Sequence, residues 1–380
     1  MLSAYLLVNC IIRIAWGGGS FRTVASAYNG ILLLSGAMIL ASSQYYFENA
    51  FASNREALIK FSNLNKTIFF IMVSTVILTI SYCYAKGIFE LSMPTLFGFL
   101  TPDMGGNLLG SAQSAKFIRT DWAMGEMSPR STVFAPYPNA SVFILVMLGL
   151  FSQLKYENLK NINSTIITCA IFICFFAFSS RTALGGFIMG TFVSMFLFKS
   201  VLSKTFIIFF FVAAAVLGAL YLNDISSSLI SYRAGSNSLR FLNYEAAITA
   251  VFTENLFFGL GIKPMDDSIA GIPLGSHSTF VSIFTKGGLI AFIPTLFIFV
   301  ILPFSLFYKL FSFHKNNPEV RGLYGSKIYH LCRIQIFMWT WICFEDIDAV
   351  AIVVFLTFLF YGYTLALYNT IKKQMYIIVI

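Results

Sequence analysis

Long apolar stretches recur along the whole chain, and their length limits the fold more than any other feature. A helix needs about 20 predominantly apolar residues to cross the hydrocarbon region of a bilayer. By that measure the sequence predicts about ten helices, near residues 2–16, 25–42, 66–85, 139–153, 164–179, 182–199, 204–222, 285–308, 328–344 and 347–368. Only Ser180 and Arg181 separate two of these stretches, so one broken stretch is an alternative there. The expected fold class is all-α, a polytopic integral membrane protein in which residues 1–380 form a single membrane domain.

The composition excludes a soluble globular domain of this size. Of the 380 residues, 58% are hydrophobic and 11% are charged, whereas a soluble domain carries roughly 25% charged residues. That leaves too few polar side chains to cover a water-exposed surface. No short apolar stretch near Met1 ends in a small-residue cleavage pattern, so we expect no cleavable signal peptide.

Lysine and arginine collect in alternate connections between the predicted helices. The residues concerned are Arg55, Lys60, Lys66, Lys155, Lys160, Lys199, Lys204, Lys309, Lys315, Arg321, Lys327, Lys372 and Lys373. Because cytoplasmic loops carry an excess of these residues, this side is predicted to be the cytoplasm, with both termini on it. The opposite side then receives two long loops, at about 86–138 and 223–284. Long loops held by a helical scaffold are where we expect a functional site.

Seven cations on the predicted outer side run against this bias: Lys116, Arg119, Arg130, Arg181, Arg233, Arg240 and Lys263. Such cations could bind an anionic ligand. Alternatively, each of them could reach the lipid headgroups or pair with Asp224, Glu245 or Asp266. Arg181 is different because Ser179–Thr182 interrupts two apolar helices. A guanidinium placed there needs a partner, and its planar fork of donors suits phosphate oxygens.

His277 is the one histidine on the predicted outer side. A neutral imidazole can accept a proton from a sugar hydroxyl or orient it, although a purely structural role has equal weight. The chain has no nucleotide-binding motif, and its outer carboxylates show no metal-ligand spacing, so we expect neither a metal nor a cofactor. An activated donor must therefore bring its own leaving group, and a polyprenyl pyrophosphate anchored in the lipid would meet the outer arginines.

Three motifs, made up of five segments, resemble those of the O-antigen polymerase and ligase superfamily. Phe178–Leu184 resembles its Ser-x-x-Arg helix start, while Leu239–Phe241 and Asn255–Ile262 resemble its Arg-bearing segment and Gly-Val-Gly turn. Gly275–Ser278 and Gly287–Ile290 resemble its His-Asn motif and the helix that follows. Order and spacing match over about residues 175–295. Leu260 replaces the usual Val and Ser278 replaces the common Asn, which puts in doubt any role carried to position 278.

This resemblance implies a metal-independent, inverting glycosyltransferase of the bacterial cytoplasmic (inner) membrane that uses undecaprenyl-pyrophosphate-linked glycans as donor and acceptor. It assigns the pyrophosphate contacts to Arg181 and Arg240, with Arg233 as a helper. It assigns the acceptor hydroxyl to His277, so that His277, Arg181 and Arg240 are the expected catalytic residues.

Three activities share these motifs or this location. A polymerase joins lipid-linked repeat units of a surface polysaccharide (O-antigen, capsule or exopolysaccharide), whereas a ligase transfers the finished glycan to lipid A–core. A flippase or transporter of the same lipid-linked oligosaccharide should place its cations along a cavity within the helices. We favour the polymerase, with membrane lipids and a chain-length regulator as partners and no role for nucleic acid.

Overall fold

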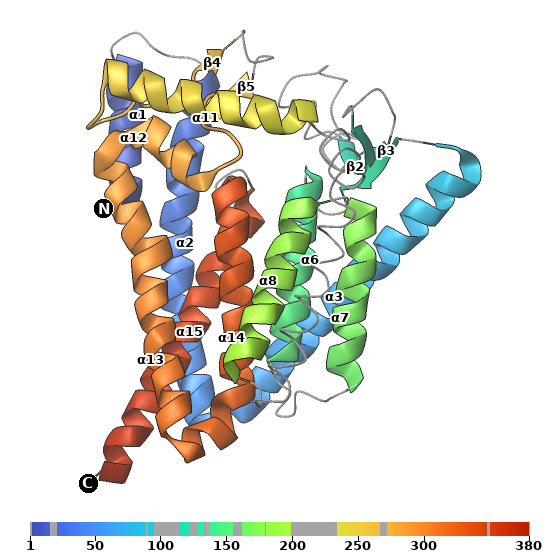
Figure 1. Cartoon of the computed structure of the whole chain (residues 1–380), viewed down its shortest axis with the longest axis vertical. Coiled ribbons are helices and arrows are strands. Elements are labelled where there is room, and N and C mark those ends of the chain that lie inside the picture. The colour runs from blue at the N-terminus through green and yellow to red at the C-terminus, as the bar shows by residue number, and fades with distance from the viewer. Residues whose placement is uncertain are drawn as a thin grey trace, which may run out of the picture. The chain divides into compact units, whose positions relative to one another are not determined.

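The computed structural model is helical apart from short strands, and it describes most of the chain (Figure 1). The residues described are 2–15, 21–88, 90–94, 114–121, 128–132, 135, 137–154, 162–178, 180–198, 234–266, 272–347 and 350–379. Five helices in this part are long and apolar enough to cross a membrane, and three shorter helices are also apolar. These helices indicate a multi-pass membrane protein, as expected, whereas the number of ten crossings stays a prediction.

The helices and strands are as follows. The helices are α1 (Leu2–Ala15), α2 (Phe21–Ser53), α3 (Arg55–Lys86), α6 (Pro138–Gln153), α7 (Ile162–Phe178), α8 (Arg181–Phe198), α11 (Ala234–Glu254), α12 (Thr279–Leu296), the π-helical η2 (Phe297–Ile301), α13 (Leu302–Asn316), α14 (Pro318–Phe344) and α15 (Ala351–Val379). The strands are β1 (Leu91–Pro94), β2 (Ser114–Asp121), β3 (Ser128–Ser131), β4 (Met265–Asp266) and β5 (Ile272–Pro273).

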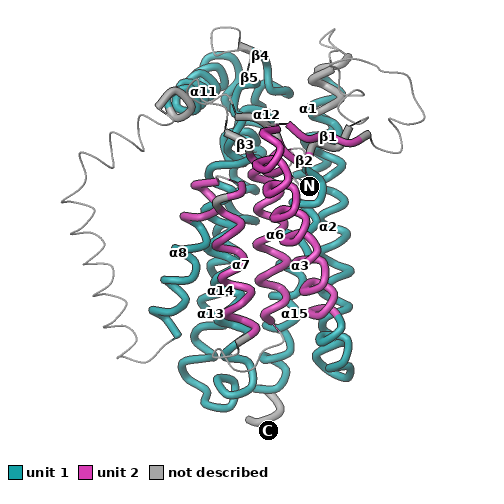
Figure 2. The backbone as a smooth tube through the Cα atoms, turned by 90° about the vertical axis from the view of Figure 1, so that its right-hand side faces the viewer, with its two compact units in different colours: residues 1–60, 186–380 teal, residues 61–185 magenta. Residues whose placement is uncertain are grey.

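The chain divides into two compact units, which Figure 2 distinguishes by colour. Unit 1 comprises residues 1–60 and 186–380, and unit 2 comprises residues 61–185. In unit 1, α2 packs along α15 with little space between them. A Cβ added at Gly36 would collide with the Phe358 ring, and the rings of Phe47 and Tyr363 meet edge to face with centroids 4.8 Å apart. The long α12–η2–α13 helix and α14 complete this unit's bundle.

Unit 2 is built around α6, in which every residue except Asn139 is buried. The Ser62 hydroxyl of α3 donates a hydrogen bond to the Ser152 carbonyl of α6 (2.6 Å), and Gly149 of α6 lets Ile171 of α7 approach closely. The three strands β1, β2 and β3 form an antiparallel sheet in that order. This sheet lies within the predicted outer loop at 86–138.

The expected helices agree with the observed ones to different degrees. The helices α1, α6, α7 and α8 begin and end within about two residues of their predicted bounds, and α7 and α8 are separate helices. Four others, α2, α3, α14 and α15, continue about ten residues past their apolar segments. The helix predicted at 204–222 lies outside the described residues, and α11 was not predicted.

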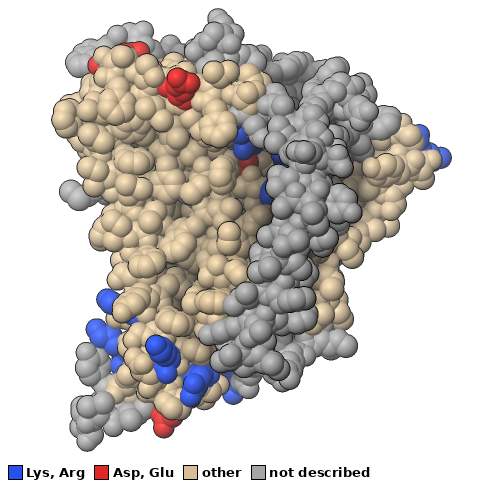
Figure 3. All heavy atoms as spheres, viewed as in Figure 1, with Lys and Arg blue, Asp and Glu red and all other residues tan. Residues whose placement is uncertain are grey.

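One end of unit 1 is rich in exposed cations (Figure 3). They lie where α13 meets α14 and where α15 ends, and the exposed residues include Lys309, Lys315, Arg321, Lys372 and Lys373. Between this end and α11, the described surface over α12 and α13 carries no charged side chain in this view. An uncharged band next to a cationic end is typical of a membrane span with its positively charged flank.

Candidate functional site

A tight turn before α12 places His277. Gly275 and His277 both have left-handed backbone conformations, with φ of 73° and 71°, and His277 is the sole non-glycine residue with positive φ in the part of the chain that the structure describes. Histidine is among the residues enriched in that conformation. Ser278 then begins the helix, because its side-chain oxygen accepts a hydrogen bond from the Val281 N–H.

The residues that follow α14 are joined to the first residue of α12. The backbone carbonyl of Glu345 accepts hydrogen bonds from both the N–H (3.1 Å) and the hydroxyl (2.8 Å) of Thr279. The Ile347 N–H in turn donates to the Thr279 hydroxyl (2.9 Å), and Thr279 is fully buried. These three bonds fix the Glu345 carboxylate beside the His277 turn.

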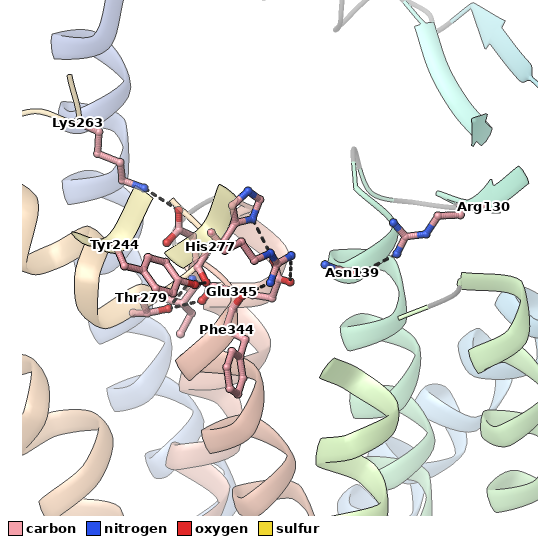
Figure 4. Close-up of polar contacts among 11 residues, drawn as sticks. Arg130, Asn139, Tyr244, Lys263, His277, Thr279, Phe344 and Glu345 are labelled. Atoms are coloured by element: carbon pink, nitrogen blue, oxygen red, sulfur yellow. Dashed lines mark hydrogen bonds and ion pairs between the residues drawn. The ribbon is translucent and has the colours of Figure 1, made fainter. Parts of the chain in front are cut away.

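The two oxygens of the Glu345 carboxylate face Arg240 and His277, and Figure 4 shows His277 and Glu345 beside each other. Arg240 Nη2 lies 3.3 Å from Glu345 Oε1, and Arg240 Nη1 donates to the Phe344 carbonyl at 3.2 Å. His277 Nδ1 lies 3.9 Å from Glu345 Oε2. The side chain of Glu345 is 10% exposed, that of Arg240 25% and that of His277 39%. The imidazole is therefore the most open group of the three, and the carboxylate is the most enclosed.

Helix α11 carries Arg240 and is attached to the same turn. The Tyr244 hydroxyl, one helical turn after Arg240, donates to the His277 carbonyl at 2.5 Å, and Asn243 Nδ2 donates to the Pro273 carbonyl at 3.0 Å. Burial raises the pKa of Tyr244 to about 12, with nearby Arg240 lowering it and Glu345 raising it further. Tyr244 is therefore a protonated donor throughout the physiological pH range.

A second ion pair adjoins this cluster. Lys263 Nζ lies 2.6 Å from Asp346 Oδ2, and both side chains are nearly enclosed, at 13% and 10% exposure. Because Asp346 follows Glu345 directly, two neighbouring carboxylates bind two cations from the long loop at 223–284. Partly buried pairs of this kind hold their geometry better than exposed ones.

The two glycine-containing motifs form one substructure. The Leu260 and Gly261 N–H groups donate to the carbonyls of Thr285 and Lys286, at 2.8 Å and 2.9 Å. In the opposite direction, the Leu289 N–H donates to the Leu256 carbonyl at 3.0 Å. These bonds replace the helical ones where α12 is broken at Gly288, whose φ and ψ are 57° and −154°.

Glycine is required on both sides of this contact. Gly259 has a φ of 67°, and a Cβ there would lie 2.5 Å from the Gly288 nitrogen. Asn9 of α1 completes the substructure, because its side-chain amide donates to the carbonyls of Phe258 (2.7 Å) and Lys286 (3.0 Å). A backbone break inside a membrane helix needs such substitute partners.

Three of the predicted outer arginines, Arg119, Arg130 and Arg181, belong to unit 2. Arg130 is buried, and its Nε donates to the Phe178 carbonyl at the end of α7 (2.8 Å) while Nη2 donates to Asn139 Oδ1 (3.3 Å; Figure 4). A cation at a helix C-terminus stabilises the last carbonyls, so Arg130 has a structural role here. Arg181 is the first residue of α8 and is exposed, and Ser180 before it accepts a hydrogen bond from the Ala183 N–H (3.4 Å).

The predicted site residues are therefore placed as follows. Arg240 and His277 are brought together on one carboxylate, Arg181 lies in unit 2, and Arg233 lies outside the described residues. Glu245, a predicted partner for the outer cations, is exposed on α11, and Asp224 lies outside the described residues. Within the described part of the chain, no group of three or more His, Cys, Asp or Glu residues could hold a metal ion.

Glu345 and Asp346 contact the predicted outer cations and His277 in the structure, but no sequence motif includes them. A usable signal was present, because two adjacent carboxylates interrupt the apolar sequence between the predicted helices 328–344 and 347–368. On a side that carries excess cations, such a pair is a natural counter-charge.

No family model matches the chain, and no curated protein is similar to it. The resemblance over residues 175–295 therefore rests on its motifs alone.

Proposed function

We propose that this chain is a polymerase of bacterial surface polysaccharide, a metal-independent inverting glycosyltransferase that joins undecaprenyl-pyrophosphate-linked repeat units at the outer face of the cytoplasmic membrane. The observation that carries the proposal is the meeting of Arg240 and His277 on Glu345. Helix α11, which carries Arg240, lies at the end of unit 1 opposite the exposed lysines and arginines (Figures 1 and 3). The bilayer would place that end outside, where lipid-linked sugars are presented.

The proposed reaction needs the two substrates to be aligned and the leaving group to be stabilised, and it needs no covalent bond between enzyme and substrate. An acceptor hydroxyl attacks the anomeric carbon of the donor, the bond from that carbon to the pyrophosphate oxygen breaks, and the configuration inverts. With the Nδ1 side of His277 facing Glu345, Nε2 is the nitrogen that takes the hydroxyl proton. Arginine donors stabilise the departing pyrophosphate, and fixed positive charge of this kind lowers such a barrier by several kcal/mol.

Arg240 is the described arginine best placed for the leaving group. Its guanidinium is one-quarter exposed while it binds Glu345 and the Phe344 carbonyl, so its orientation is set before a ligand arrives. Arg181 and Arg233 are proposed to contribute to the same pyrophosphate, on the strength of the motif resemblance. The cytoplasmic placement of both termini and a chain-length regulator as partner belong to the same proposal.

The ligase alternative shares every residue named above, and the products separate it from the polymerase. The flippase alternative expects cations inside the helix bundle, and Arg333 of α14 is buried there. Its guanidinium, however, packs over the rings of Phe187 and Tyr329 and donates to the Thr191 hydroxyl (3.2 Å). Protein groups thus surround Arg333, which favours a structural role.

The test is to examine lipid-linked glycans in a deletion strain complemented with wild type, His277→Gly or His277→Asn. Gly and Asn both tolerate the positive φ at this position, so each removes the imidazole without straining the turn. If the proposal holds, single repeat units accumulate on the carrier and long chains return with wild type alone. Arg321→Gln, an exposed change at the opposite end of unit 1, is the matched control and restores long chains.

Three outcomes would each contradict a different part of the proposal. Long chains that accumulate on the carrier without reaching their final acceptor identify a ligase. Repeat units that stay on the inner leaflet identify a flippase. Full rescue by His277→Gly removes His277 from the reaction.

A further inference from the structure

Helix α11 carries an exposed apolar stripe, defined here as Phe241, Ile248 and Phe252. Their spacings of seven and four residues place them on one face of the helix. Phe241 is 73% exposed and Phe252 61%, whereas Asn243, Ala247 and Val251 on the inner face are fully buried. Glu245, four residues after Phe241 and three before Ile248, lies along one edge of this stripe. The exposed face beyond that edge carries Ser238, Thr249 and Thr253 together with Leu242. The stripe thus lies between a protein-covered face and a largely polar one.

This helix does not cross a membrane itself. It is not among the five long apolar helices, and it contains Arg240, Glu245 and Glu254. Figure 1 shows it running crosswise over the end of unit 1, where α2 and the α12–α13 helix run lengthwise. A helix of this composition and orientation, next to helices that span, matches the pattern of a helix in the membrane–water interface.

The stripe continues the exposed apolar surface of the neighbouring span. The Phe252 ring lies 6.1 Å from that of Phe284 in α12, and the Ile290 N–H of α12 donates to the carbonyl of Phe257, which is itself exposed. Ile290, Ile293 and Phe297 carry the exposed apolar surface onward along the helix. A bilayer that covers this span up to its end therefore reaches the stripe without interruption.

We infer that α11 is an interfacial helix whose stripe is immersed in the lipid of the leaflet that surrounds the site. Thr249 and Thr253 then face water, Glu245 lies at the edge of the stripe where its carboxylate reaches the headgroups, and the adjoining Arg240 lies at the depth of the lipid phosphates. A headgroup-level guanidinium suits a lipid-anchored anionic ligand. The inference itself needs no substrate, so it can fail or hold separately from the proposed reaction.

Nitroxide labels can measure the depth of each face of α11. Cys169 and Cys343 are the exposed native cysteines among the described residues and are first replaced by Ser. A label is then attached at Phe241→Cys, Ile248→Cys or Phe252→Cys in the full chain, held in nanodiscs of phosphatidylethanolamine and phosphatidylglycerol. Thr249→Cys, on the polar face of the same helix, is the matched control. Collision rates are measured with oxygen, which concentrates in hydrocarbon, and with a water-soluble nickel chelate.

The stripe positions should collide mainly with oxygen, and the ratio should reverse at Thr249. Three stripe positions are labelled so that one misfolded variant does not decide the result. Equal nickel access at all four positions would place α11 in water and overturn the inference. Exclusion of both reagents from the stripe would also overturn it, because protein, either a second copy or a partner, would then cover that face.

Discussion

The Glu345 carboxylate contacts two side chains at once, because Arg240 approaches one of its oxygens and His277 approaches the other. A carboxylate enclosed to this degree is stable only when charged or hydrogen-bonding groups compensate it. Arg240 provides that compensation, and the carboxylate in return orients both side chains. At the scale of single residues, the site therefore depends on a group that no motif of the sequence includes.

We expect Glu345→Gln to lower the proposed polymerisation on the order of 10- to 100-fold, the range typical of removing a group that orients a metal-bound imidazole. The amide keeps the size of the side chain but loses the charge that positions Arg240 and His277. The rate of chain extension is to be measured with purified protein at several concentrations of lipid-linked repeat unit. A positioning role lowers kcat more than it raises KM.

Glu254→Gln is the control for this variant, because it removes one exposed carboxylate from the end of α11. It should extend chains at the wild-type rate. An unchanged kcat in Glu345→Gln would mean that the carboxylate does not position the reacting groups.

Tyr244 makes the stability of the site turn sensitive to alkaline pH. Its pKa rises from 10.0 to about 12 on burial, so the folded state binds the phenolic proton more tightly than the unfolded state. The contribution of this proton to the free energy of unfolding is fully present below pH 10 and is lost as the pH rises toward 12. The midpoint of thermal unfolding in detergent should therefore fall more steeply over this range in wild type than in Tyr244→Phe. Parallel curves for the two proteins would contradict this.

The motifs single out Arg240 and His277 in the sequence, but they do not give the partners of these side chains. Glu345 reaches both only through the folded contact between Thr279 and the end of α14. Arg130 shows the same limit in reverse. Its position in an outer loop leaves the partner of its side chain open, and in the structure that side chain binds the end of α7.

At the scale of elements, the break in α12 explains why two glycine motifs are needed. Residues 256–261 supply the hydrogen bonds that α12 lacks on either side of Gly288, and both backbones approach too closely for a Cβ. The arrangement secures the loop that continues to Lys263 and then to the His277 turn. A rigid base of this kind positions groups better than a free loop would.

Gly288→Ala should therefore destabilise the protein by about 1–3 kcal/mol, because alanine must adopt a strained conformation and its Cβ would collide with the Phe257 carbonyl. Gly322→Ala in α14 is the matched control, since a Cβ there meets nothing within 4 Å. That change should be neutral or stabilise by about 0.5–1 kcal/mol, as expected for alanine in a helix. The comparison uses thermal unfolding in the same detergent, and equal midpoints for the two variants would mean that the break tolerates a side chain.

Apolar length predicted where most helices lie, but it predicted their ends correctly only where the apolar stretch and the helix end together. The sequence places α6, α7 and α8 correctly because their ends coincide with the ends of apolar stretches. Helices α2, α14 and α15 continue into polar sequence, for example from residue 42 to Ser53 in α2, because helical hydrogen bonding does not require apolar side chains. Helix α11 was missed because its apolar residues form a stripe and not a continuous run.

At the scale of the whole molecule, the distribution of charge in unit 1 distinguishes its two ends. Exposed lysines and arginines gather at the α13–α14 turn, and α11, which carries Arg240, lies at the other end (Figures 1 and 3). The positive-inside rule then predicts the orientation of the unit. Helix α1, with 14 residues, rises only about 21 Å and is too short to cross a bilayer alone, so the side of the N-terminus stays a prediction.

The orientation can be tested with a membrane-impermeant thiol reagent on intact cells, after Cys169 and Cys343 are replaced by Ser. Thr253→Cys on α11 should react from outside. Asn316→Cys at the end of α13 should react only after the membrane is permeabilised. The reverse pattern would place the site in the cytoplasm and would rule out a reaction at the outer face.

The two hydrogen bonds of Asn9 have a consequence for biosynthesis. They join α1 to carbonyls that follow 249 and 277 residues later in the chain. At a translation rate of about 5–20 residues per second, α1 leaves the ribosome roughly 12–50 s before its nearer partner exists. During that interval another hydrogen-bonding group, from lipid, water or the insertion machinery, must satisfy the Asn9 amide. Helix α1 is thus synthesised long before the segment around Phe258 and Lys286 to which it binds, so its docking can only be a late step of assembly.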